Sequence, residues 1–95
     1  MDLDFILVEL KMAGVELKQR HLGIKFYLFG SILQSGRITN DVDILVIYDG
    51  PEEPAHVREV LHDLSHRYPL DLYFMTNEEE SDLDFINRTS AQLIS

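Results

Sequence analysis

Three aspartates in two apolar segments have the types and spacing that metal chemistry requires. Asp41 and Asp43 flank Val42 at the start of one apolar segment, and Asp71 lies inside another. Residues two apart in a strand extend from the same face, so a third carboxylate from a neighbouring strand completes an oxygen-rich cluster. Such a cluster is self-repelling unless a divalent cation neutralises it, and Mg²⁺ prefers hard oxygen ligands. Taken alone, an Asp-x-Asp pair often only caps or solvates a strand.

A glycine and a serine follow a third apolar segment and suit an anion. Gly30 lets the backbone approach a phosphate closely, and the hydroxyl and amide groups at Ser31 would bind that phosphate. Two cations held by the aspartates would polarise an attacking oxygen and a leaving phosphate oxygen together. Gly-Ser alone is common in turns. Combined with the aspartates, it indicates metal-dependent transfer at a nucleoside triphosphate.

Alternating helices and strands must position these residues. The spacing of apolar residues predicts a helix from Asp2 to about Arg20, with a buried face of Leu3, Ile6, Leu10, Ala13 and Leu17. A second long helix is expected from Pro54 to just before Pro69, with apolar positions Val57, Val60, Leu61, Leu64 and Tyr68. β-branched and aromatic content predicts strands over residues 24–29, 42–48 and 70–75.

The remaining segments are shorter. Residues 32–35 suit a short helix, and residues 36–40 form a polar loop. Thr76 or Asn77 caps a last short helix, in which Glu78, Glu79 and Glu80 form a solvated start and Leu83, Phe85 and Ile86 are anchors. The tail over residues 87–95 is either a short strand or a frayed end.

Composition limits the classes of function. The 95 residues are 45% hydrophobic and 26% charged, which is typical of one globular domain, assigned here to residues 1–95. The formal charge of −9 repels nucleic acid backbones, so direct nucleic-acid binding is not expected. The absence of cysteine suits a reducing compartment, and no apolar run approaches the roughly 18 residues of a membrane span. We therefore expect a cytoplasmic chain without membrane association.

The combined pattern resembles a known family. Leu28-Phe29-Gly30-Ser31, nine intervening residues, Asp41-Val42-Asp43 and then Leu70-Asp71-Leu72 are similar to the minimal nucleotidyltransferases of the DNA polymerase beta superfamily. The resemblance implies an α/β (α+β) nucleotidyltransferase fold with a small mixed sheet of three to four strands flanked by helices. It also implies that Gly30 and Ser31 hold the triphosphate, that Asp41 and Asp43 bind metal, and that Asp71 completes the metal site and helps activate the acceptor hydroxyl.

The sequence departs from that family after the serine. Family members usually carry basic residues there, whereas residues 32–36 contain none. Arg37, or less favourably Lys25, would supply the missing charge in nucleotide binding, although Arg37 is equally consistent with a solvated loop. Asn40 also stands where a serine usually precedes the first aspartate.

The resemblance implies Mg²⁺ or Mn²⁺ as cofactor and ATP or another nucleoside triphosphate as substrate. It further implies transfer of AMP to a hydroxyl of a protein partner, as the antitoxin-like component paired with a helical HEPN-type toxin. The alternative is a catalytically weak or inactive module that neutralises its partner by contact alone. Apolar residues on the first helix or around Phe85 serve a homo-oligomer, a hetero-complex or only the core, and the sequence leaves these open.

Two further features have simpler interpretations. His62 and His66 share a helix face at a spacing that zinc can use, but exposed histidines on helices are ordinary. Tyr73 has the same strand parity as Asp71, which would place it beside a nucleobase, although a core or rim aromatic is the simpler reading.

Overall fold

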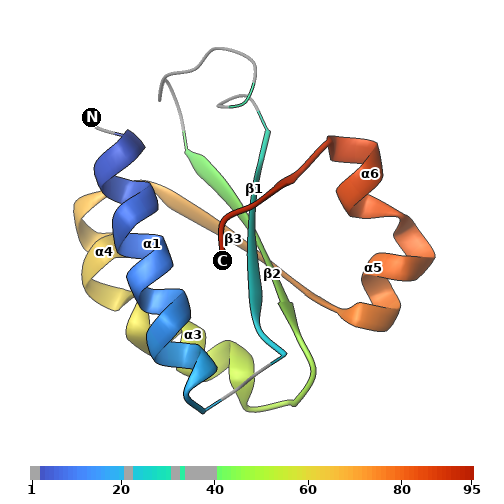
Figure 1. Ribbon diagram of the computed structural model, residues 1–95, viewed down its shortest axis with the longest axis horizontal. Coiled ribbons are helices and arrows are strands. Elements are labelled where there is room, and N and C mark those ends of the chain that lie inside the picture. Colours follow the sequence, from blue (N-terminus) through green and yellow to red (C-terminus); the bar gives the residue numbers. More distant parts are fainter. Residues whose placement is uncertain (1–2, 21–22, 31–32, 34–40) are drawn as a thin grey trace.

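A four-stranded sheet with the order β3-β2-β1-β4 organises the molecule (Figure 1). The computed structural model describes residues 3–20, 23–30, 33 and 41–95. The strands are β1 (Lys25–Phe29), β2 (Val42–Tyr48), β3 (Leu70–Thr76) and β4 (Gln92–Leu93). β1 pairs antiparallel with β2 and β4, whereas β2 and β3 are parallel. The sheet is therefore mixed, as expected from the family resemblance.

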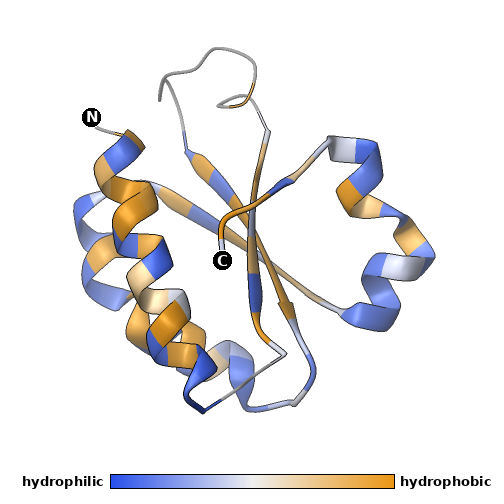
Figure 2. Cartoon of the chain, viewed as in Figure 1, coloured by the Kyte–Doolittle hydropathy of each residue, from blue (hydrophilic) through white to orange (hydrophobic). Residues whose placement is uncertain are grey.

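Three helices cover one face of this sheet: α1 (Leu3–Lys18), α3 (Glu53–Val60) and α4 (His62–Arg67) (Figure 1). Alternate strand residues point toward these helices, and the apolar face of α1 packs against them because burying both faces together removes apolar surface from water. The resulting core contains Ile6, Leu10, Leu17, Phe26, Leu28, Val42, Ile44, Val46, Val57, Leu61 and Leu64, among others. Figure 2 shows the apolar residues that run along the strands and these helices.

The other face of the sheet is covered in part by α5 (Asn77–Leu83) and α6 (Phe85–Thr89) (Figure 1). Phe29, Leu45 and Ile47 form a second, smaller buried cluster there, against which Phe85 and Ile86 of α6 pack. Because successive strand residues alternate between faces, β1 and β2 contribute to both clusters. The second cluster lies on the face that carries Asp43 and Asp71.

Each of the two helices predicted after residue 53 is divided into two helices in the structure. The helix expected over residues 54–68 is two helices, because Leu61 leaves helical geometry at φ −90° and ψ 4° while its side chain stays buried. The last helix divides at Asp84, which has a left-handed conformation at φ 51°. This turn redirects the chain, so that Phe85 and Ile86 reach the second cluster.

The structure also defines the N-cap of α5 and the conformation of the C-terminal tail. Thr76 and Glu79 form a capping box in which the Thr76 hydroxyl accepts from the Glu79 amide at 3.1 Å and Glu79 accepts from the Thr76 amide at 2.9 Å. Thr76 is therefore the cap. The tail pairs with β1 through β4, and the Ile94 amide donates to the Phe26 carbonyl at 2.7 Å. Of the two alternatives for residues 87–95, the short strand is confirmed at Gln92–Leu93, whereas residues 87–89 belong to α6.

Candidate active site

The register of the sheet brings two of the predicted aspartates side by side. Asp43, near the start of β2, is the direct partner of Asp71 near the start of β3. Parallel strands place equivalent ends at one edge, so both side chains leave the same face at the same level. Asp43 is also the partner of Phe29 at the end of β1, and Gly30 follows. One edge of the sheet therefore carries Gly30, Asp43 and Asp71.

The aspartates are also linked electrostatically. The pKa of Asp43 is raised above its ordinary value of 3.8, first by burial and then by the charges of Asp71 and Asp41. Nearby negative charges and loss of solvent both disfavour the ionised carboxyl. Asp41 is exposed immediately before β2, and Asp43 and Asp71 are partly buried. The charges of Asp41 and Asp71, both predicted site residues, thus act on Asp43 in the fold.

Gly30 is required at this edge for two reasons. Its φ of 89° lies in the left-handed region, which residues with a side chain rarely adopt. The Asp43 carboxylate also occupies the space where a Cβ at position 30 would lie. The sequence predicted a glycine that admits a phosphate. The structure adds that this glycine admits the carboxylate of Asp43.

Aromatic side chains support the carboxylate edge. The Tyr73 hydroxyl donates a hydrogen bond of 3.0 Å to Oδ2 of Asp71. The Tyr73 ring meets Phe29 edge-on at 5.1 Å between centroids, and Phe29 meets Phe85 in the same way at 5.0 Å. The hydrogen bond to Asp71 is the main cause that raises the pKa of Tyr73, and the charge of Asp71 adds to it.

Sequence reasoning missed this role of Phe29 and Phe85. The only sequence signal was that Phe29 directly precedes Gly30. Nothing local pointed to Phe85, whose contact depends on the turn at Asp84.

The aspartates fit a divalent cation by chemistry but not as a ready-made cage. Carboxylate oxygens are the hard donors that Mg²⁺ prefers, and Asp41, Asp43 and Asp71 supply them. Within the described part of the chain, however, no three His, Asp or Glu side chains are already grouped to hold a metal ion. The hydrogen bond from Tyr73 occupies Oδ2 of Asp71 and leaves Oδ1 of that carboxylate as a donor for a cation.

The other predicted site residues are less informative. Ser31 and Arg37, together with residues 34–40 and most of the short helix expected over residues 32–35, lie outside the described residues. Lys25 pairs with Ile47 at the opposite end of β1 from Phe29, about 13 Å along the strand. That separation exceeds the reach of a lysine side chain, so Lys25 is wrong as the source of charge at this edge.

The histidine pair and most of the glutamate run lie on the surface. The rings of His62 and His66 lie 4.4 Å apart on the exposed side of α4. No third ligand joins them among the residues that the structure describes. Glu78 and Glu79 are exposed at the start of α5, where Glu79 completes the N-cap. Glu80, also predicted to be solvated, is instead half-buried and accepts a hydrogen bond of 2.9 Å from the Ile86 amide. None of the helices in residues 3–20, 23–30, 33 and 41–95 combines the length and apolar composition needed to cross a membrane.

Comparison with known proteins gives the family. The family model described as "Nucleotidyltransferase domain" matches residues 13–92, which include β1, β2, β3 and all three aspartates. No curated protein and no solved structure gave a match. Nucleotidyltransferase families generally use a divalent metal ion and a nucleoside triphosphate. Since the matched segment covers most of the chain, the chain belongs to the nucleotidyltransferase domain family of the DNA polymerase beta superfamily, of the minimal type.

Proposed function

We propose that this chain is a Mg²⁺-dependent nucleotidyltransferase that transfers AMP from ATP to a hydroxyl of a protein partner. The observation that carries the proposal is the pairing of Asp43 with Asp71 at one sheet edge, with Gly30 packed against Asp43. The raised pKa of Asp43 supports it, because clustered carboxylates with perturbed pKa values are typical of catalytic sites.

Each residue has a role in the proposed reaction. Gly30 and Ser31 would bind the phosphates that leave as pyrophosphate, and Asp41 and Asp43 would hold Mg²⁺. When bound, Mg²⁺ supplies charge neutralisation and polarises phosphate oxygens. The acceptor oxygen attacks the α-phosphorus, the bond from that phosphorus to the bridging oxygen breaks, and Asp71 accepts the acceptor proton. The hydrogen bond from Tyr73 supports this role, because Asp71 already accepts a hydrogen bond from a phenolic hydroxyl within the chain.

The proposed partner is a HEPN-type toxin, with this chain as the antitoxin-like component. Family resemblance suggests this setting, and the formal charge of −9 favours association with a basic protein. Arg37 is the proposed cation for the triphosphate, since residues 32–36 provide none. A partner surface would also complete the open carboxylate edge.

Intact-mass measurement of the co-purified complex tests the proposal. We expect the partner to gain whole AMP units with ATP and Mg²⁺, and to gain none with the D41A/D43A double variant. An Asp82→Ala variant, which removes one exposed carboxylate from α5, should transfer normally. Unchanged transfer by D41A/D43A would rule out the catalytic assignment of these aspartates.

The second candidate is a binding module of the same fold that neutralises its partner by contact. It is favoured by the lack of basic residues at positions 32–36 and by the absence of a preformed three-ligand group in the described residues. A stable partner whose mass never changes with any nucleotide, and which D41A/D43A still neutralises, would select this candidate.

A further inference from the structure

Helix α1 carries a second apolar stripe that the fold leaves exposed. Phe5, Val8, Met12 and Val15 are 38%, 54%, 62% and 61% exposed. Their spacings of three, four and three residues match the a and d positions of a heptad. At about 100° per residue, this stripe lies nearly opposite the buried face of the same helix. A contiguous exposed apolar stripe of this kind marks an interaction surface.

The two flanks of the stripe carry opposite charges. Glu9 and Glu16 lie along one side, in the e positions, and Lys11 and Lys18 lie along the other, in the g positions. A surface with an apolar centre, one acidic flank and one basic flank is complementary to a copy of itself. Exposed apolar residues elsewhere in the described chain, such as Leu83 and Leu93, lack this arrangement.

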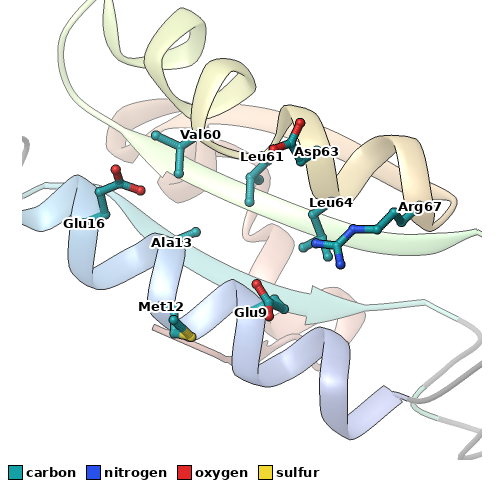
Figure 3. Close-up of a pocket in the computed structure, with 9 residues that line it drawn as sticks. All are labelled: Glu9, Met12, Ala13, Glu16, Val60, Leu61, Asp63, Leu64 and Arg67. Carbon is teal, nitrogen blue, oxygen red and sulfur yellow. The ribbon is translucent and has the colours of Figure 1, made fainter.

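A groove runs along the acidic flank. It lies between α1 and the α3–α4 pair and has a volume of about 390 Å³. Figure 3 shows Glu9 and Glu16 on the α1 side, with Asp63 and Arg67 on the α4 side. Three of these four charged residues are acidic, so the flank favours a basic occupant. Arg67 lies 5.9 Å from the Phe5 ring, which positions that end of the stripe beside α4.

We propose that a second copy of this chain binds here, with the two α1 helices parallel and related by a twofold axis along them. The two apolar stripes cover each other, and Lys11 of each copy lies opposite Glu16 of the other, because g and e positions five residues apart meet in parallel pairs. The basic flank of each copy thereby lies over the acid-rimmed groove of the other.

The charges at the middle of α1 favour the parallel orientation. An antiparallel pair would place Lys11 beside the other Lys11 and Glu9 beside the other Glu9 there, and would bring Asp4 beside Lys18 of the other copy only at the helix ends. The parallel pair has one kind of like-charge contact, Asp4 with Glu9, and Asp4 lies in the first turn of α1, where the helix dipole stabilises carboxylates. The inference does not rest on the proposed function, since α1 covers the sheet face opposite Asp43 and Asp71.

Sedimentation equilibrium of the isolated chain tests the dimer. We expect the mass to rise from 11.0 kDa toward twice that value between about 10 µM and about 1 mM protein, since a small interface associates weakly. Met12→Glu should leave the chain monomeric throughout this range. Leu83→Glu is the matched control, because Leu83 is also exposed, at 49%, but lies on α5 rather than beside Lys11. Circular dichroism spectra verify that both variants are folded.

A charge exchange tests the orientation. Lys11→Glu and Glu16→Lys should each weaken the dimer at least threefold, and the double variant should restore it. A dimer that Glu16→Lys alone does not weaken would indicate the antiparallel pair and overturn the proposed arrangement. A wild-type chain that stays monomeric, or a stripe that binds a different protein as a monomer, would overturn the dimer itself.

Discussion

Asp43 is the residue at which burial and charge oppose each other most directly. It is partly buried, it faces Asp71 across the β2–β3 pair, and its carboxylate fills the space that Gly30 leaves open. An ionised carboxyl there is less stable than one in water. An ionised Asp43 therefore destabilises the folded chain when no cation is bound, and a bound cation would relieve this cost.

This conflict predicts a pH-dependent stability. Because the pKa of Asp43 is raised above 3.8 in the folded chain, its contribution to stability is fully present below that value and is lost as pH rises through the folded pKa. In metal-free buffer, Asp43→Asn should therefore unfold at higher urea than the wild type at pH 7. The difference should shrink as pH falls toward 4. Asp82→Asn is the charge-matched control, and an equal gain from it would show only a net-charge effect.

The Tyr73–Asp71 hydrogen bond leads to a prediction that can be tested without an activity assay. Removing the acceptor with Asp71→Ala should lower the pKa of Tyr73, because the hydrogen bond and the charge of Asp71 are the first two causes of its rise. Tyrosine-labelled NMR titration measures this pKa, and Tyr73→Phe identifies the resonance by its loss. An unchanged titration of Tyr73 in Asp71→Ala would contradict the contact.

For catalysis, the same hydrogen bond predicts a positioning role of Tyr73. Tyr73→Phe keeps the ring against Phe29 but frees Asp71, and loss of such an orienting partner costs about 10- to 100-fold in activity. Turnover of ATP with the partner measures the effect. Tyr48→Phe is the control, since Tyr48 packs against the core on the other sheet face. Full activity of Tyr73→Phe would exclude the positioning role.

At the level of elements, α5 depends on its N-cap more than on burial. It has no buried residue, yet both hydrogen bonds of the Thr76–Glu79 capping box are present. Asp84 and Ser90, which have left-handed backbone conformations, lie at the two ends of α6. Phe85 of α6 contacts Phe29 near the site. The cap and the turn together set where α6 lies.

We therefore expect Thr76→Ala to destabilise the chain by about 1 kcal/mol, the usual cost of losing an N-cap side chain. Urea unfolding measures this loss. Ser81→Ala, at an exposed position of the same helix, should cost nothing, because alanine is the better helix former. Equal stability of wild type and Thr76→Ala would show that α5 is held by other contacts.

At the level of the whole molecule, a net charge of −9 on 95 residues opposes folding through self-repulsion. Simple salt screens such charge over about 10 Å at 0.1 M, whereas a bound divalent ion acts at one place. The two effects are separable by comparing cations at equal ionic strength.

We expect Mg²⁺ to raise the thermal midpoint of the wild type above that in NaCl of matched ionic strength, because binding to the folded state alone stabilises it. Removing Mg²⁺ with EDTA should reverse the gain. The extra gain should vanish in D41A/D43A, while the NaCl effect remains. Equal midpoints in both salts for the wild type would show that the carboxylates hold no cation.

The sequence by itself determined most of the elements and named the residues of the candidate site. Local spacing predicts α1 and the three long strands, because burial of one face imposes a period of 3.6 or 2 on the chain. The Gly-Ser pair, the Asp-x-Asp motif and the aspartate inside a third strand together resemble the active site of one family. This resemblance named Gly30, Asp41, Asp43 and Asp71 as candidate site residues.

Only the tertiary structure decided how these parts meet. The Asp43–Asp71 register, the exclusion of Lys25 and the contact of Tyr73 with Asp71 depend on strand pairing between segments far apart in the chain. The left-handed turn at Asp84 has the same origin, since it brings Phe85 and Ile86 against apolar side chains of β1 and β2. Periodicity within a segment records which face is buried, but not which partner buries it.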